Sequence, residues 1–186
     1  MDTTNSATPQ LFTGTAIPQP ACRDTPWEIL NDMGQQVYSI TEDRNCFCEY
    51  FLGIKGPLSI HFTDHTGGVV MEVYRPCTCA YCPEKVQVRT PSGVPMAYIA
   101  KTFFSKTLKI QNENGADILK MVEPSFCSNT FQITSIAGNY QVGRAVINHS
   151  GIPFCPQATI RDIHFPLDLD IKMKAAILSA CLFLET

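Results

Sequence analysis

Short turns that contain glycine recur along this chain at intervals of roughly 22 to 33 residues. They separate runs rich in β-branched and aromatic residues, and several runs alternate apolar and polar residues, as at 58–62. A period of two is typical of half-buried strands, and glycine supplies the positive φ that tight hairpins need. The pattern therefore predicts successive antiparallel hairpins. The turn glycines are Gly34, Gly67, Gly93, Gly115 and Gly138.

The hairpins predict about ten or more strands, and a sheet of that size usually closes to remove its edges. The lumen of a closed barrel must then be filled. The only strongly apolar helix candidate is the segment at residues 175–184. We therefore predict a mainly β protein, a closed antiparallel β-barrel around a C-terminal apolar helix at about residues 168–184.

Two interpretations of this apolar segment are open, a buried core helix and a membrane anchor. A spanning helix needs roughly 20 apolar residues to cross about 30 Å of hydrocarbon, and residues 175–184 supply half of that length. Length therefore favours the core helix and disfavours a single-pass span. The helix residues expected in the core are Ala175, Ile177, Leu178, Leu182 and Phe183.

The length of 186 residues suits one domain with a sizeable core. Residues 1–26 contain four prolines among Thr, Ser, Ala and Gln and show no hydrophobic period. Such a composition is typical of a flexible tail. We therefore predict an N-terminal tail over residues 1–26 and one barrel domain over residues 27–186.

The formal net charge of −3 argues against the strongly basic surface that binds nucleic acid. No GxSxG, P-loop or HExxH motif is present, so we do not expect an enzyme. The N-terminus shows no basic and apolar regions of a signal peptide, so we expect the nine cysteines to be reduced. Reduced cysteines pack in cores, bind metals or carry S-acyl chains.

Five collinear segments resemble the phospholipid scramblase family, and the resemblance covers about four fifths of the chain. It implies a tubby-like closed barrel of about 12 strands around a central C-terminal helix. It also implies palmitoylated cysteines at the cytoplasmic face of the plasma membrane, and calcium-activated movement of phospholipids between leaflets without ATP. The segments are EILNDMGQQVYSITED at 28–43, HFTDHTGGVVMEVYRPC at 61–77, PSGVPMAYI at 91–99, KIQNENGADILKMVEP at 109–124 and FPLDLDIKMKA at 165–175.

The cysteine-rich loop of the family corresponds here to Cys77, Cys79 and Cys82. Stable anchoring needs two acyl chains, because one gives only marginal binding, so three candidate lipidation sites suffice. Inert surface thiols are one alternative. Zinc is another, since Cys79 and Cys82 have ligand spacing and Cys46 and Cys48 could complete a site. Packing or spectator roles are expected for Cys22, Cys127, Cys155 and Cys181.

The resemblance places an acidic calcium loop over residues 157–168. Calcium takes about six to eight oxygen ligands. Gln157, Thr159 and Arg161 occupy three alternating positions of that loop, and the arginine repels a cation. We therefore expect the calcium cofactor implied by the resemblance to bind weakly or not at all. The remaining ligand candidates are Asp162, Asp168 and Asp170.

A purely structural role is the alternative for two of these aspartates. Asp168 and Asp170 would then sit in the first turn of the terminal helix, where a negative charge favours the helix dipole.

These observations predict a membrane-associated, scramblase-like lipid transporter with weakened calcium activation. The alternative is a non-catalytic lipid-binding or interaction protein, a divergent paralogue. The expected partner is a phospholipid membrane, with protein partners left unspecified and no nucleic acid. We expect a monomer or weak oligomer at the plasma membrane, on its cytoplasmic face, held peripherally or by lipid anchors.

Overall fold

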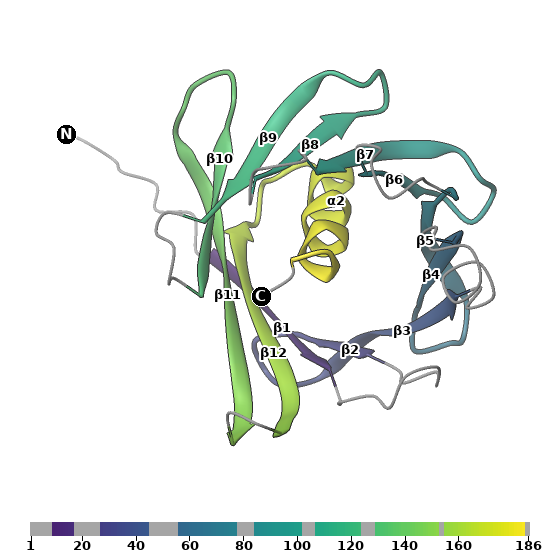
Figure 1. Cartoon of the computed structure of the whole chain (residues 1–186), viewed down its shortest axis with the longest axis vertical. Helices are drawn as coiled ribbons and strands as arrows, with labels where there is room; N and C mark the ends of the chain where they lie inside the picture. The colour runs from purple at the N-terminus through teal and green to yellow at the C-terminus, as the bar shows by residue number, and fades with distance from the viewer. Residues whose placement is uncertain are drawn as a thin grey trace.

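The computed structural model describes residues 9–16, 27–44, 56–77, 84–101, 107–123, 129–152 and 155–184. These ranges hold twelve strands and one helix (Figure 1). The strands are β1 (Pro9–Ala16), β2 (Trp27–Leu30), β3 (Gln36–Arg44), β4 (Leu58–Thr63), β5 (Val69–Arg75), β6 (Glu84–Arg89), β7 (Pro95–Lys101), β8 (Leu108–Asn112), β9 (Asp117–Val122), β10 (Thr130–Ser135), β11 (Gln141–Ile152) and β12 (Cys155–Pro166). The helix is α2 (Ile171–Leu182).

The strands lie side by side in chain order, and every pair is antiparallel. Strand β1 joins the two ends of this series, because it pairs with β12 along its whole length and with β2 over residues 13–15. The strand order therefore returns to its start and forms a closed barrel. The prediction of a mainly β, antiparallel architecture with a C-terminal helix is confirmed.

Strand β1 lies inside the segment for which the sequence predicts a flexible tail. The prediction of a flexible tail is therefore wrong for residues 9–16. The difference has a physical reason, because cross-strand backbone hydrogen bonds need no hydrophobic period, and the partner β12 comes from the far end of the chain. Pro9 stands at the first position of the strand, where a missing N–H is tolerated.

The lumen is lined by alternate residues of the strands. In β4, buried and partly buried residues alternate without a break from Leu58 to Thr63, and β6 continues the same pattern. Alternate residues of β2 to β12 thus supply a continuous apolar core. Its largest fully buried side chains include Phe62, Ile99, Ile110, Met121, Ile133 and Ile147.

Helix α2 lies inside the barrel and contacts β7 and β8 most extensively, with further contacts to β6 and β12. Figure 1 shows it on that side of the ring rather than at its centre. All residues from Ala176 to Cys181 are buried, as expected of a helix that is apolar around its whole circumference. Ala176 and Ala180 are completely buried, and these small side chains allow the helix to approach the sheet closely.

The connections of the barrel alternate between its two ends. The end that we call the turn end carries the hairpin turns at 31–35, 64–68, 90–94, 112–116 and 136–140 and the start of α2. The opposite end, here the loop end, carries the last residues of β3, β5 and β7 and the C-terminal end of α2. Four turns have glycine at positive φ, whereas in the fifth Asn139 takes this conformation at φ 47° in place of Gly138.

Candidate functional site

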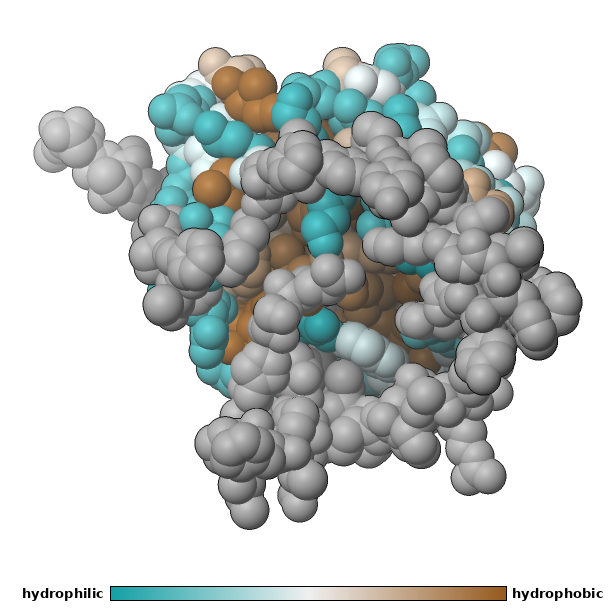
Figure 2. Space-filling model, viewed as in Figure 1, coloured by the Kyte–Doolittle hydropathy of each residue, from teal (hydrophilic) through white to brown (hydrophobic). Residues whose placement is uncertain are grey.

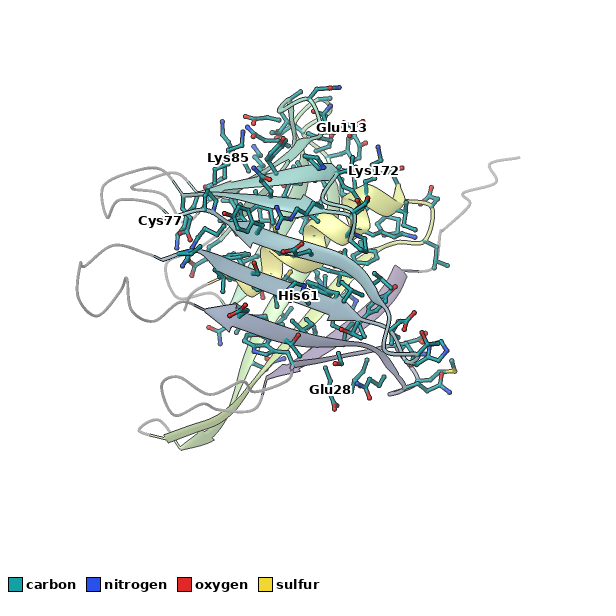
Figure 3. The ribbon with its side chains drawn as sticks, turned by 90° about the vertical axis from the view of Figure 1, so that its right-hand side faces the viewer. Glu28, His61, Cys77, Lys85, Glu113 and Lys172 are labelled. Carbon is teal, nitrogen blue, oxygen red and sulfur yellow. The ribbon has the colours of Figure 1, made fainter. Side chains whose placement is uncertain are left out.

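Cys77 is exposed just beyond β5, at the loop end of the barrel (Figure 3). The base of its connection is held by Arg75, a buried arginine at the end of β5. Arg75 Nη1 donates to Glu84 Oε1 in β6 at 2.9 Å, and Nη2 donates to the Gly56 carbonyl oxygen at 3.3 Å. One guanidinium therefore fixes the place where the cysteine-rich connection leaves the barrel.

Two groups of the other cysteines differ in their position relative to the described residues. The lipidation candidates Cys79 and Cys82 lie outside the described residues, as do Cys22, Cys46, Cys48 and Cys127. Cys155 is the first residue of β12. The described part of the chain brings no three His, Cys, Asp or Glu residues together as a metal site. The zinc alternative, which needs Cys46, Cys48, Cys79 and Cys82, thus concerns residues beyond the described ranges.

Three lysines form a row across the outer face of β6 to β9. Strand register aligns Lys85 with Ala100, Ala100 with Lys109, and Lys109 with Lys120. Lys109 forms an ion pair with Asp117 at 2.7 Å, and the ammonium of Lys85 lies 4.3 Å from the ring centre of Tyr98. Lys109 and Lys120 stand directly opposite each other, an arrangement of like charges that disfavours the sheet. We call Lys85, Lys109 and Lys120 the lysine row.

The segment expected to form a calcium loop is mostly a strand. Residues 157–166 lie in β12, which is paired with β1 on one side and with β11 on the other. Successive side chains of a strand point to opposite faces, so Arg161 and Asp162 diverge. Asp162 accepts a hydrogen bond from Asn148 Nδ2 at 2.9 Å. A ladder with diverging side chains does not provide the convergent oxygen shell that calcium requires.

The other two aspartates lie at the turn end. Asp168 is exposed in the turn after β12. Asp170 is the N-cap of α2, and its Oδ1 accepts from the backbone N–H groups of Lys172 at 2.9 Å and Met173 at 3.3 Å. Figure 3 shows the neighbouring Lys172 beside Glu113 of the β8–β9 turn, an ion pair of 3.3 Å. The expectation that both aspartates lie in the first turn of the helix is therefore wrong, because α2 begins at Ile171; Asp170 instead stabilises the helix as its N-cap.

The five helix residues expected in the core differ in their burial. Ile177 and Leu178 are buried, whereas Ala175, Leu182 and Phe183 are partly buried and pack against the core. The sequence reasoning missed Ala176 and Ala180, which are completely buried; their spacing of one helical turn was the available signal. No helix among the described residues is long and apolar enough to cross a membrane.

The lumen also contains a thiol and a cation. Cys181 is completely buried, and burial raises the pKa of its thiol to about 12. Arg161 reaches the end of α2, where its Nη2 donates to the Leu184 carbonyl oxygen at 3.4 Å. Its guanidinium carbon lies 4.6 Å from the ring centre of Trp27. Residue type alone marks Arg161 only as a poor calcium ligand, because strand register and position in the lumen depend on long-range pairing.

The two described thiols should differ sharply in their reactivity. We expect iodoacetamide at pH 8 to modify Cys77 in the folded protein and to leave Cys181 unmodified, because the thiolate is the reactive form and Cys181 is buried with a raised pKa. Peptide mass spectrometry after alkylation, with and without denaturant, measures both sites. Modification of Cys181 at the rate of Cys77 without denaturant would contradict the buried position.

Comparison with known proteins is consistent with this architecture. The scramblase family model matches residues 24–186. Mouse phospholipid scramblase 1 is 35% identical over 175 residues, which cover 86% of this chain and 53% of the mouse protein. Human phospholipid scramblase 2 is also 35% identical over 175 residues, covering 86% of this chain and 58% of the human protein. The chain thus spans little more than half the length of these relatives.

A solved structure supports the fold independently. The crystal structure of a protein from Arabidopsis thaliana aligns with a TM-score of 0.53 and 12% identity, covering 96% of this chain and 90% of that protein. At this identity the likeness shows the fold alone. The family model and the sequence relatives carry the assignment, and they show that this chain belongs to the scramblase family.

Proposed function

We propose that this protein moves phospholipids between the leaflets of a membrane without ATP, as a lipid transporter rather than a chemical catalyst. The family match over residues 24–186 carries this proposal, since the named relatives are phospholipid scramblases. The barrel with its buried helix is the unit that would perform it. The expected site of action is the cytoplasmic face of the plasma membrane.

Membrane attachment would combine two features near the β5–β6 connection. Acyl chains on Cys77, Cys79 and Cys82 would supply the apolar anchor, and the exposed position of Cys77 supports modification there. The lysine row begins at Lys85, on the strand that follows this connection (Figure 3). Anionic lipid attracts each lysine near its surface by about 1 kcal/mol. Together these features orient the outer face of β6 to β9 toward lipid.

Calcium control is proposed to be weak or absent in this protein. The support is the geometry of β12, in which Asp162 bonds Asn148 while Asp170 caps α2. The three aspartates do not converge, and Arg161 lies in the same segment. Translocation should therefore proceed equally with calcium and with a chelator.

The test is translocation of a fluorescent phospholipid in liposomes that carry the purified, acylated full chain. We expect dithionite to quench inner-leaflet label faster than in protein-free liposomes, with the same rate in calcium and in chelator. The joint substitution Cys77→Ala, Cys79→Ala and Cys82→Ala should move the protein from the membrane to the soluble fraction of cells. The matched control replaces Cys22, Cys127 and Cys155 by Ala and should stay membrane-bound.

Three outcomes would correct the proposal. Translocation that requires calcium would show a binding site elsewhere in the chain. If the variant without Cys77, Cys79 and Cys82 stays in the membrane fraction, acylation of these cysteines is not what anchors the protein. Membrane recruitment without any translocation would favour the second candidate, a non-catalytic lipid-binding protein. That candidate has its own support in the structure, because α2 and its packed side chains occupy the part of the lumen beside β7 and β8, from the turn end to the level of Arg161.

A further inference from the structure

The side chain of Arg161 belongs to the lumen face of β12. Ile163 and Phe165, two and four residues further along the strand, are buried in the core, and side chains at such spacing share one face. The contact of Arg161 with the Leu184 carbonyl oxygen places the guanidinium at the end of α2. The strand continues toward the loop end from Arg161 to Cys155, beyond the level at which the helix ends. Arg161 therefore lies at the boundary between the part of the lumen that α2 fills and the part toward the loop end that α2 does not occupy.

This cation has a carbonyl oxygen and an aromatic ring beside it, but no carboxylate partner is found for it among the described residues. Its Nε and Nη1 atoms are covered and have no hydrogen-bond acceptor among the described residues. The Cys181 thiol interacts electrostatically with Arg161, but burial raises the pKa of this thiol to about 12, which keeps it neutral. Burial correspondingly lowers the pKa of Arg161. A covered guanidinium with unpaired N–H groups is unfavourable, so an anion beside it would be strongly stabilised.

The surroundings of this cation are apolar. Figure 2, viewed from the loop end of the barrel, shows a hollow whose visible inner surface is largely hydrophobic. Trp27, at the first position of β2, presents its ring to the guanidinium. Leu182 and Phe183 are partly buried at the adjoining end of α2. A ligand for this place needs an anionic group for Arg161 and a hydrocarbon part for the hollow.

We propose that Arg161 is the anion-binding residue of a lumenal site for an anionic amphiphile, with a phosphate or carboxylate head group on the guanidinium. The planar fork of Nε and Nη groups suits either head group, because both accept two parallel hydrogen bonds. Arg161 is only partly buried, and binding requires its side chain to turn these covered donors toward the hollow. The hydrocarbon chain lies against Trp27 and the apolar wall. This site is distinct from the proposed transport, since it can be occupied without a bilayer.

The experiment is calorimetric titration of the full chain in solution with four probes below their micelle concentrations. Dodecyl phosphate and dodecanoate carry both features of the ligand, dodecanol carries only the chain, and inorganic phosphate carries only the charge. We expect the two anionic amphiphiles to bind and the other two to bind at least about tenfold more weakly. Tighter binding of dodecyl phosphate would indicate a phospholipid as the natural ligand, and tighter binding of dodecanoate would indicate a free fatty acid.

Two variants test the residue. Arg161→Met should weaken dodecyl phosphate about ten- to hundredfold, and Arg161→Lys should weaken it less because the charge stays while the fork is lost. Arg144→Met is the matched control, since Arg144 is exposed on the neighbouring strand β11 and loses the same charge. If Arg161→Met does not fold, the test is the loss of affinity for dodecyl phosphate that Arg161→Lys causes.

Two results would overturn the proposal. The first is equal affinity of wild type and the folded Arg161 variants for dodecyl phosphate. The second is binding of dodecanol or inorganic phosphate as tight as that of dodecyl phosphate. This result would mean that the site does not need both an anionic head group and a hydrocarbon chain. Because no bilayer is present, either result leaves the liposome test of translocation unaffected.

Discussion

Replacing Ile177 by aspartate should destabilise the folded state of this protein severely. Ile177 is 0% exposed at the middle of α2, enclosed by the barrel. A carboxylate there loses its hydration without gaining a partner, which costs several kcal/mol, on top of the lost packing of the isoleucine. A typical domain is stable by only about 5 to 15 kcal/mol. Circular dichroism during thermal unfolding should therefore show no cooperative transition, or one lowered by more than 10 °C.

The matched control for this substitution is Ile171→Asp on the same helix. Ile171 is 79% exposed at the first position of α2, where a negative charge interacts favourably with the helix dipole. We expect the unfolding midpoint of Ile171→Asp to remain within about 2 °C of wild type. Equal effects of the two substitutions would mean that α2 is not enclosed by the strands.

Gly143→Ala should destabilise the barrel by about 1 to 3 kcal/mol. A Cβ at Gly143 would overlap the backbone carbonyl oxygen of His164 on the neighbouring strand. That oxygen cannot yield easily, because β12 is held by β11 on one side and by β1 on the other. The expected lowering of the unfolding midpoint is about 2 to 10 °C, measured by scanning calorimetry.

Gly68→Ala is the control for Gly143→Ala. A Cβ at Gly68 would have its nearest contact at 3.5 Å, from the Asp64 carboxylate, which is an ordinary van der Waals distance. The backbone N–H of Gly68 keeps its hydrogen bond to Asp64 Oδ1. We expect the midpoint of this variant to stay close to wild type. A loss as large as that of Gly143→Ala would point to glycine flexibility in general rather than to close strand approach.

Local sequence patterns predict most of the strands in this fold. Alternation of apolar and polar residues identifies β4 and β6, and four of the five turn glycines take the expected positive φ. Strand β1 escapes this reasoning, since its hydrogen bonds to β12 leave no periodic signal in a proline-containing segment. The fifth turn differs because asparagine can also adopt a left-handed conformation, which shifts that role to Asn139.

The candidate site residues follow the same division between local and long-range information. Residue type alone identifies Cys77 as a thiol suited to acylation. The connection that carries Cys77 is held by Arg75, whose bonds to Glu84 of β6 and to the Gly56 carbonyl oxygen join segments that are separate in the sequence. Aspartates at 162, 168 and 170 look like ligands in the sequence, yet strand pairing directs Asp162 to Asn148 and helix geometry directs Asp170 to the N-cap. The difference arises because convergence of ligands depends on backbone conformation, which residue types do not specify.

Period, turn residues and segment length are local properties, and they suffice to predict the mainly β class, the positions of the hairpins and the burial of an apolar C-terminal helix. The pairing of β1 with β12, and the position of Arg161 beside Trp27 at the end of α2, emerge from the folded barrel alone. Those pairings join segments far apart in the chain. Their geometry is set by register around the whole barrel, and no local pattern encodes it.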